Sequence, residues 1–331
     1  MAGGEVMVAE RLVKKYGEVL ALRGVSFRVR RGEIFGFLGP NGAGKTTTMH
    51  ILATLLKPTS GRAVVAGYDV LEEPREVRKR IGMVFQDPSL DTDLTAYENL
   101  YIHGKLYGVR GRELEERIRE LLEFVELWEH RDRLVKTFSG GMRRRLEVAR
   151  ALLHDPEILF LDEPTLGLDP QTRAHIWEYI KRLRREKGVT IFLTTHYMDE
   201  AEELCDEIAI IDRGRIIAEG TAEQLKSMIG DEIVYLTVEG NGDPCRTLSM
   251  GFVKECRRLG GSRLSLRVVN ASEALPLLIQ RASESGFKVR EASYRRPTLN
   301  DVFLHLTGRE IRDTGAEAFE TMRMIIRRGR F

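Results

Sequence analysis

The stretch GPNGAGKT (39–46) constrains the fold of this 331-residue chain more than any other feature of its sequence. It fits the phosphate-binding-loop pattern at every fixed position, and its glycines let backbone N–H groups approach phosphate oxygens. A helix N-terminus beside such a loop adds further N–H donors and a partial positive charge. The apolar run before the loop predicts a strand, and GKTTTMHILATLL (44–56) predicts a helix. A strand, a glycine loop and a helix in this order predict an α/β fold with a mainly parallel sheet.

The positions of this loop have separate tasks in binding a nucleoside triphosphate. We expect Lys45 to reach the β- and γ-phosphates and the Thr46 hydroxyl to ligate Mg²⁺. The residues expected to bind ATP here are Gly39, Pro40, Asn41, Gly42, Ala43, Gly44, Lys45, Thr46 and Thr47. A glycine turn before an ordinary helix is the alternative, but the strand and helix predicted on either side favour a nucleotide site.

Three further apolar runs predict buried strands of the same sheet. They are IGMVF (81–85), EILFL (157–161) and VTIFLTT (189–195). Each is short, rich in branched residues and separated from the next by helical patterns, as in parallel strands that are covered on both faces.

Polar residues follow these runs directly, at the carboxyl ends of strands where parallel sheets bind their ligands. We expect Asp162 to hold Mg²⁺ and Glu163 to orient or deprotonate the attacking water. Gln86 is expected to contact the magnesium and the water, and His196 to sense the γ-phosphate. Paired acids can also be a solubilising strand end, and a terminal Gln or His an ordinary edge residue. The phosphate-binding loop upstream favours the catalytic interpretation.

Other segments interrupt the α/β alternation. Residues 5–38 alternate apolar and polar side chains, which predicts an antiparallel β subdomain, and 207–219 predict a hairpin that turns at Arg213–Gly214. Residues 88–137 predict a helical subdomain, because ELEERIRELLEFVELW (113–128) carries an apolar stripe at helical spacing. The stripe consists of Leu114, Ile118, Leu121, Leu122, Val125 and Trp128.

The pattern changes after residue 230. We therefore predict a nucleotide-binding domain over 5–230 and a small α+β domain over 231–308. DEIVYLTVEG, SRLSLRVVN and FKVREASY predict its strands, and SEALPLLIQRASESG predicts its helix. The charged tail over 309–331 is expected to be solvated or frayed, with a surface-docking helix as the alternative.

Composition excludes several classes of protein. Hydrophobic residues make up 42% and charged residues 31%, which is typical of a globular chain, and a net charge of +2 gives no footprint for nucleic-acid binding. The three cysteines stand at unrelated spacings, so we expect neither a disulfide framework nor a zinc site. This use of cysteine fits a reducing cytosol. The N-terminus lacks the apolar core of a signal peptide. No apolar run reaches the ~18 residues of a membrane span, so any work at a membrane is expected to need a partner.

A second glycine-rich helix start follows at Ser139-Gly140-Gly141. Its N–H groups suit another anion, although glycines before a helix are often simple caps. One triphosphate needs only one phosphate-binding loop. The second start is therefore expected to face the nucleotide of another copy, so that two chains arranged head-to-tail enclose two ATP molecules.

These motifs, taken in order, resemble the ATPase subunit of ABC transporters over about residues 5–225. The motifs are GPNGAGKTT, Gln86, FSGGM (138–142), ILFLDE (158–163), GLD (167–169) and His196. The resemblance implies a P-loop NTPase fold and a homodimer. It further implies that Tyr16 stacks on adenine, that Asp169 links the two sites across the dimer, and that the region after Gln86 contacts a membrane subunit.

Phe138 and Met142 stand where the family's signature, LSGGQ, has its first and last residues, which puts the contact of that glutamine in doubt. RPTLNDVFLHLTG (296–308) resembles the closing segment of daunorubicin-resistance-type export ATPases. This implies an exporter subunit that pairs with a separate integral membrane permease and is bound peripherally at the cytoplasmic face of the membrane. No nucleic-acid partner is expected.

Three alternatives stay open at the level of sequence. One is a soluble ABC ATPase acting on ribosomes or DNA, but such chains usually carry a second nucleotide domain or long insertions. Another is the ATPase subunit of an importer, which only the C-terminal domain distinguishes from an exporter. The third is a module that binds ATP without hydrolysis, against which the complete set of Lys45, Asp162, Glu163 and His196 weighs.

Overall fold

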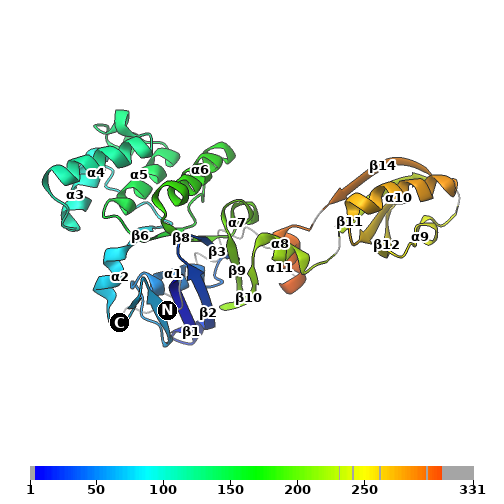
Figure 1. The fold of residues 1–331 in the computed structure, drawn as a ribbon, viewed down its shortest axis with the longest axis horizontal. Helices are drawn as coiled ribbons and strands as arrows, with labels where there is room; N and C mark the ends of the chain where they lie inside the picture. Colours follow the sequence, from blue (N-terminus) through cyan, green and yellow to red (C-terminus); the bar gives the residue numbers. More distant parts are fainter. Residues whose placement is uncertain (1–3, 231, 241, 261, 296, 308–331) are drawn as a thin grey trace. The chain divides into compact units, whose positions relative to one another are not determined.

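The computed structural model describes residues 4–307 apart from 231, 241, 261 and 296, and it divides into two compact units (Figure 1). Unit 1 extends to Ala222 and unit 2 begins at Glu223. The tail predicted over 309–331 lies outside the described residues. Along the stretches of chain that are described, none of the helices combines the length and the apolar character needed to cross a membrane.

A six-stranded sheet forms the centre of unit 1. Its strands, in spatial order, are β10 (Arg215–Gly220), β9 (Glu207–Asp212), β3 (Ile34–Leu38), β8 (Thr190–Thr195), β7 (Ile158–Asp162) and β6 (Ile81–Val84). The five strands from β9 to β6 are parallel, and β10 forms an antiparallel hairpin with β9. All residues of β3, β7 and β8 are buried. The predicted parallel sheet and the hairpin turn at Arg213–Gly214 are therefore confirmed.

Helices cover both faces of this sheet, which gives two apolar clusters. Along β3, Ile34 joins the cluster on the α5 and α6 side, whereas Phe35 and Phe37 join the one on the α1 side, because successive strand residues point to opposite faces. The main covering helices are α1 (Lys45–Leu52), α2 (Pro74–Arg80), α5 (Gly140–Leu152), α6 (Pro170–Lys187) and α7 (Met198–Leu204). Helix α1 ends four residues before the predicted end at 56, since Thr54 adopts a left-handed φ of 62°.

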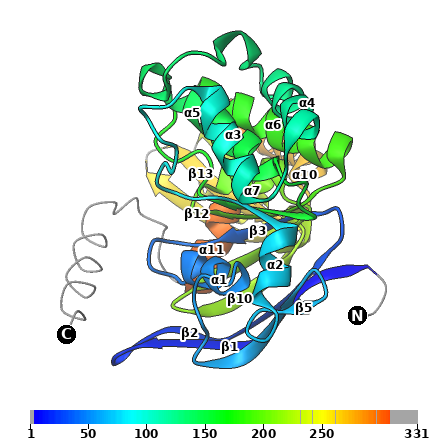
Figure 2. The same cartoon turned by 90° about the vertical axis from the view of Figure 1, so that its left-hand side faces the viewer.

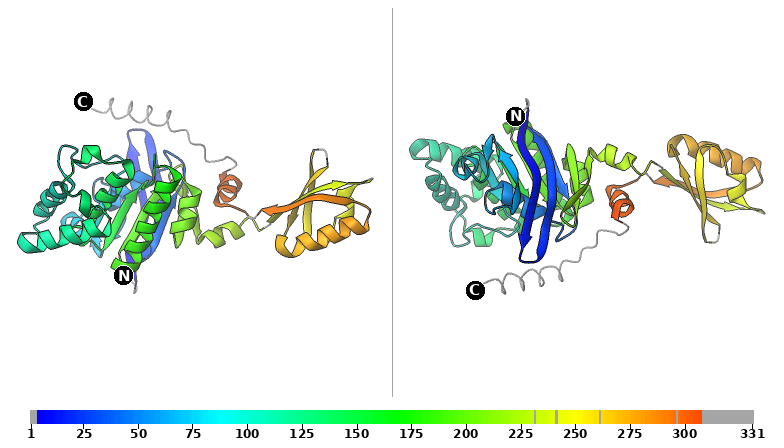
Figure 3. Two further views of the ribbon diagram at one scale, coloured as in Figure 1. Left: turned by 90° about the horizontal axis from the view of Figure 1, so that it is seen from above. Right: turned by 90° about the horizontal axis from the view of Figure 1, so that it is seen from below.

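The predicted antiparallel subdomain is a second sheet of unit 1 (Figure 3). Its strands, in spatial order, are β2 (Val19–Arg30), β1 (Glu5–Tyr16), β4 (Ser60–Val65) and β5 (Tyr68–Asp69). Buried and exposed side chains alternate along much of β2, where Val25, Phe27 and Val29 face the core.

The helical subdomain contains α3 (Ala96–Leu106) and α4 (Gly111–Phe124), followed by the short 3₁₀ helices η1 (Trp128–His130) and η2 (Val135–Thr137). Figure 2 shows α3 and α4 beside α5. The predicted stripe is buried from Leu114 to Val125. Trp128, predicted on the same helix, lies in η1 and is half-buried against the same cluster, because α4 ends at Phe124 and Glu126 has a left-handed φ of 56°.

Unit 2 is built on a four-stranded antiparallel sheet, with α10 (Ala271–Glu284) lying along one face (Figure 3). The strands, in spatial order, are β12 (Val253–Gly260), β13 (Arg263–Val268), β11 (Glu232–Glu239) and β14 (Lys288–Arg295). The unit also contains α9 (Pro244–Thr247), α11 (Leu299–Thr307) and all but the first residue of α8 (Ala222–Ser227). Strand β12 was not predicted, because VKECRRLG lacks a clear alternation of apolar and polar residues.

The cysteine prediction is wrong for unit 2. Cys245 in α9 and Cys256 in β12 form a disulfide, with Cα atoms 5.5 Å apart. The spacing of the cysteines in the sequence could not indicate this pairing, because it depends on how α9 packs against a strand that was itself not predicted. Cys205 in unit 1 is a free thiol.

Candidate functional site

The glycine loop joins β3 to α1, and its last residue, Gly44, makes no side-chain cap at the N-terminus of that helix. Gly44 caps α1 with a left-handed φ of 109°, and a Cβ at this position would lie 2.7 Å from the Leu22 side chain. Only glycine meets both constraints without strain. The first turn of α1 contains no acidic residue, so its N–H groups and partial positive charge suit an anion.

Lys45 follows at the first position of α1 and is 4% exposed. Its ammonium group donates to the carbonyls of Gly39 at 2.7 Å and Pro40 at 3.2 Å, and lies 3.3 Å from Glu163 Oε1. Burial lowers the pKa of Lys45, while the neighbouring carboxylate of Glu163 acts in the opposite direction. The lysine is thus directed back over the loop, where a bound phosphate would lie.

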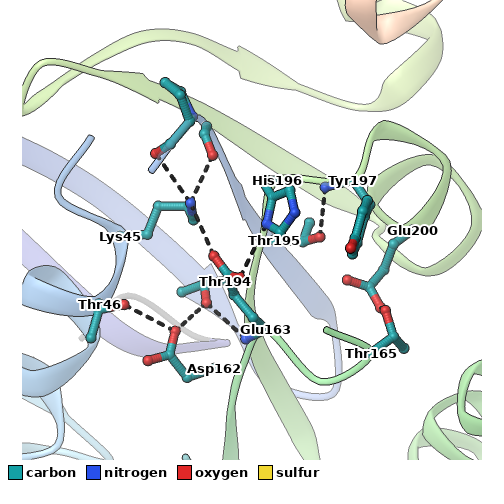
Figure 4. A network of polar contacts seen from close by, with 12 residues as sticks. Lys45, Thr46, Asp162, Glu163, Thr165, Thr194, Thr195, His196, Tyr197 and Glu200 are labelled. Atoms are coloured by element: carbon teal, nitrogen blue, oxygen red, sulfur yellow. Dashed lines mark hydrogen bonds and ion pairs between the residues drawn. The ribbon is translucent and has the colours of Figure 1, made fainter. Parts of the chain in front are cut away.

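Asp162 ends β7 and connects the loop to the neighbouring strand β8 (Figure 4). Its Oδ1 accepts from the Thr46 hydroxyl at 3.2 Å and also from the Thr194 hydroxyl. Burial raises the pKa of Asp162, and these two hydroxyls partly offset the increase. A hydroxyl and a carboxylate side by side are the hard oxygen ligands that Mg²⁺ uses when it also binds substrate phosphates. These residues therefore fit a magnesium ion.

Glu163 is the centre of the cluster in Figure 4. Its Oε2 lies 3.1 Å from His196 Nδ1, and its backbone N–H donates to the Thr194 hydroxyl at 3.1 Å. Burial raises the pKa of Glu163, but the His196 hydrogen bond and the Lys45 charge outweigh it, so the net pKa lies below the ordinary value. An ionised, held carboxylate of this kind can accept a proton.

Glu163 also has a strained backbone, with a φ of 46° at a non-glycine residue. Such residues cost about 1–3 kcal/mol and persist only where their surroundings hold them. The strain lies at the residue whose carboxylate meets Lys45 and His196, which supports a functional constraint on its direction.

Two other predicted residues lie around this cluster. Tyr16, at the end of β1, is half-buried beside Thr47 of α1; burial raises the pKa of Tyr16 and the Thr47 hydroxyl acts against this. Gln86 is half-buried and follows β6, whose neighbour in the sheet is β7. Gln86 therefore lies at the edge of the parallel sheet where Asp162 and His196 also lie, and Tyr16 lies beside the start of α1.

Ser139, Gly140 and Gly141 lie at the start of α5, and both Ser139 and Gly140 are exposed. The Ser139 hydroxyl caps the helix by accepting from the Met142 N–H at 3.3 Å. A Cβ on Gly141 would lie 2.6 Å from the Thr172 side chain, so α5 and α6 meet closely there. Asp169 caps α6 and accepts from Thr172 through both carboxylate oxygens. The two elements predicted to act on another copy therefore lie next to each other.

The sequence did not identify three buried residues of this region: Arg144, Thr194 and Glu200. Thr194 contacts both acids, and its position two residues before His196 on the same strand was an available signal. Arg144 is the middle one of three consecutive arginines, and the run by itself does not show which of them is buried. Glu200 accepts from Thr165 and Trp177, and burial raises its pKa; nothing in its local sequence distinguished it.

Two family models match the chain. The model described as ABC transporter matches residues 22–166. The model described as ATP-binding protein DrrA1-3-like, C-terminal domain, matches residues 220–307.

Curated relatives match along almost the full length of both chains. Daunorubicin resistance ATP-binding protein DrrA3 of Streptomyces coeruleorubidus is 43% identical over 89% of this chain and 93% of its own. Linearmycin resistance ATP-binding protein LnrL of Bacillus subtilis is 39% identical over 93% and 100%. Nod factor export ATP-binding protein I of Ralstonia nicotianae is 43% identical over 93% and 95%.

Solved structures match about two thirds of the chain. CbiO1 of Clostridium perfringens, part of the ABC transporter complex cbiONQ, aligns with a TM-score of 0.63 and 29% identity over 67% of this chain and 90% of its own. The ATP-binding cassette MJ0796, in a dimeric post-hydrolysis state bound to ADP and Pi, aligns with a TM-score of 0.59 and 30% identity over 65% and 98%.

Proposed function

This chain belongs to the ABC transporter family as the ATP-binding and ATP-hydrolysing subunit of an exporter, and from that premise we propose that two copies of it enclose two ATP molecules and drive a separate integral membrane permease. The chain is then bound peripherally at the cytoplasmic face of the membrane. The observation that carries the proposal is the buried cluster in which Lys45, Asp162, Glu163 and His196 converge beside the glycine loop.

Each residue of the cluster has a task that follows from its geometry. Lys45 exchanges its present carbonyl and carboxylate partners for the β- and γ-phosphates when ATP binds. Glu163 is ionised and held by His196, so it can orient a water and accept its proton. Thr46, Asp162 and Gln86 would hold Mg²⁺, which supplies neutralising charge for the phosphates. Tyr16, half-buried beside the start of α1, would stack on the adenine.

The dimer is supported by the exposed start of α5. Ser139, Gly140 and Gly141 present a helix N-terminus beside Asp169, and this combined surface suits the terminal phosphate of a second copy. A head-to-tail arrangement would place it over the partner's loop, with Asp169 linking the two sites. The similar ATPase MJ0796 is dimeric in its solved structure. ATP would hold the closed dimer together, and hydrolysis would release it, so the permease is switched by the difference in dimer affinity between the two states.

The names of the relatives support an exported compound as the cargo. Two of those given above are resistance proteins and one is a Nod factor export protein. We propose that this chain also powers the export of organic compounds, which the permease subunit selects.

Glu163→Gln tests the chemistry. Its carboxamide has nearly the same shape but cannot accept the proton, so kcat should fall by at least about 100-fold while ATP affinity is kept. With ATP bound and not hydrolysed, the variant should sediment as a dimer. A variant that hydrolyses ATP at the parent rate would exclude Glu163 as the base, and an ATP-loaded variant that stays monomeric at high concentration would exclude the shared site.

Ser139→Arg tests the dimer separately. Its long side chain should block the approach of the second copy while leaving the loop of its own chain untouched, so ATP still binds but ATP-dependent dimerisation is lost. Exposed Thr137→Arg, on the preceding turn, is the matched control and should dimerise normally. Unchanged dimerisation of Ser139→Arg would count against the shared site.

A further inference from the structure

Arg144 lies on α5, one turn after the Ser139 cap, yet it points into the interior and is 7% exposed. A guanidinium group has five N–H donors in a rigid plane. In Arg144 the group makes five hydrogen bonds: to the carbonyls of Phe85, Asp162, Glu163 and Pro164, and to the carboxylate of Glu147. Its donors match the five acceptors around it.

Three of these acceptors are consecutive carbonyls on the turn that carries Glu163. Nη2 donates to Asp162 O at 2.9 Å and Glu163 O at 3.1 Å, and Nε donates to Pro164 O at 2.8 Å. This is the turn on which Glu163 has its left-handed φ of 46°. Three charge-assisted hydrogen bonds from one rigid group can hold a turn that would otherwise relax.

The fourth carbonyl belongs to a different loop. Nη1 donates to Phe85 O at 2.6 Å, directly before Gln86. The same face of α5 holds the other end of that loop, because Glu147 accepts from the Ser89 N–H at 2.9 Å and Arg150 donates to Ser89 O at 2.6 Å. Residues 85–89 are therefore attached to α5 at both ends.

The buried charge is balanced locally. Glu147 is 2% exposed and lies 3.0 Å from Arg144, so the two form a buried ion pair. Such pairs contribute little net stability, since desolvation of both charges offsets their attraction. Stability alone therefore gives a weak reason for an arginine here, whereas control over the direction of Glu163 gives a stronger one.

We propose that Arg144 is a positioning residue for hydrolysis, which aims the Glu163 carboxylate by holding the backbone of its turn and ties that turn and the Gln86 loop to the helix that begins at Ser139. The inference rests on the proposed role of Glu163 as the base. In the proposed dimer, the start of α5 faces one nucleotide and Glu163 faces the other. Through Arg144, α5 would then fix the position of Glu163 relative to the start of the helix.

The test replaces the ion pair as a unit in the full-length chain. Arg144→Gln alone would leave Glu147 buried without its partner, and that variant could lose activity through instability. In Arg144→Gln/Glu147→Gln both charges are removed, and the carboxamide that replaces the Glu147 carboxylate can still accept from the Ser89 N–H. The carbonyls that lose their donors should lower the melting temperature, so activity is measured well below it. We expect kcat to be at least about tenfold lower and the KM for ATP to stay within about threefold.

Two further variants separate positioning from packing. Arg144→Lys keeps the charge beside Glu147 but has only three donors and no planar fork, so its kcat should be intermediate. Arg145→Gln is the matched control: this neighbour bonds to Val125 O and the Tyr179 hydroxyl, away from the Glu163 turn, and its loss should change kcat by less than about twofold.

The outcomes distinguish this inference from the proposed function. If Glu163→Gln is inactive while the double variant and Arg144→Lys both keep the parent kcat, Arg144 does not position Glu163 and the inference is overturned. If the parent chain does not hydrolyse ATP, or if Glu163→Gln hydrolyses it normally, the proposed function itself fails. A low kcat with an unchanged KM, in a variant that is fully folded at the assay temperature, supports the positioning role.

Discussion

Unit 1 and unit 2 both have apolar cores, but they differ in the ionisable side chains that they bury. Among the described residues, unit 1 buries ionisable side chains around the glycine loop and α5, including Lys45, Arg144, Asp162 and Glu163, whereas the buried side chains of unit 2 are apolar. Removing a charge from water is costly unless it is paired and hydrogen-bonded. Buried ionisable groups cluster at functional sites, so this difference indicates that unit 1 carries out the chemistry.

Unit 2 is stabilised by more ordinary means. Its apolar cluster lies between the sheet and α10, and the Cys245–Cys256 disulfide attaches α9 to β12. Its ion pairs lie at the surface, such as Arg258 with Asp243. Changes in unit 2 should therefore alter its stability without altering ATP hydrolysis, and the predictions below test this separation.

The largest effect is expected from Lys45→Ala in unit 1. It removes the buried ammonium group that lies over the glycine loop, so kcat/KM should fall about 10³-fold, equivalent to about 4 kcal/mol. Lys79→Ala, which removes an exposed lysine paired with Glu76, is the control and should be neutral. Steady-state ATPase assays measure both. A Lys45→Ala chain with near-parent kcat/KM would show that the loop is not part of the active site.

Cleavage of the disulfide should destabilise unit 2 alone. The cysteines are 11 residues apart, and closing a loop of this length stabilises a fold by about 3 kcal/mol in the chain-entropy model. Cys245→Ala/Cys256→Ala should therefore speed hydrogen exchange in β12 and β13 while kcat stays at the parent value. A matching fall in kcat would show that the two units are not energetically separate.

Two helix caps, one in each unit, allow a comparison in which the expected loss of stability is smaller and equal. Asp169 caps α6 in unit 1 and Asn270 caps α10 in unit 2, each accepting from backbone N–H groups of its own helix. Replacement of either by Ala should cost about 1 kcal/mol of stability. Only Asp169→Ala should also weaken ATP-dependent dimerisation, which analytical sedimentation would detect. Equal effects of both variants on dimerisation would contradict the proposed role of Asp169.

The smallest expected effect is a shift in pH dependence. Burial raises the pKa of Asp162, and the hydrogen bond from Thr194 acts against this increase. Thr194→Val removes that donor to the charged form, so the pKa of Asp162 should rise further. Because the ionised carboxylate is the form that would hold Mg²⁺, the acid limb of kcat/KM should move to higher pH. A limb that stays in place or moves to lower pH would show that Asp162 does not set it.

The residues that we propose to bind the nucleotide could be identified from the sequence alone. The glycine loop, Asp162 and Glu163 after one apolar run, and His196 after another could all be identified from local patterns. Such patterns are short in range: a tight loop needs glycine, and the ends of parallel strands meet at one edge of a sheet. The parallel sheet, the antiparallel subdomain and the helical stripe up to Val125 were predictable for the same reason.

The tertiary structure alone decided which distant residues support these positions. Arg144 bonds to carbonyls 18–20 residues later in the chain and to Phe85, 59 residues earlier. Gly141 meets Thr172 because two helices pack closely, and the pairing of Cys245 with Cys256 depends on β12, whose charged sequence concealed a strand. A residue's own neighbours determine its backbone preference and chemistry, but the partner of a buried charge or thiol is set by how separate elements pack, which no local pattern records.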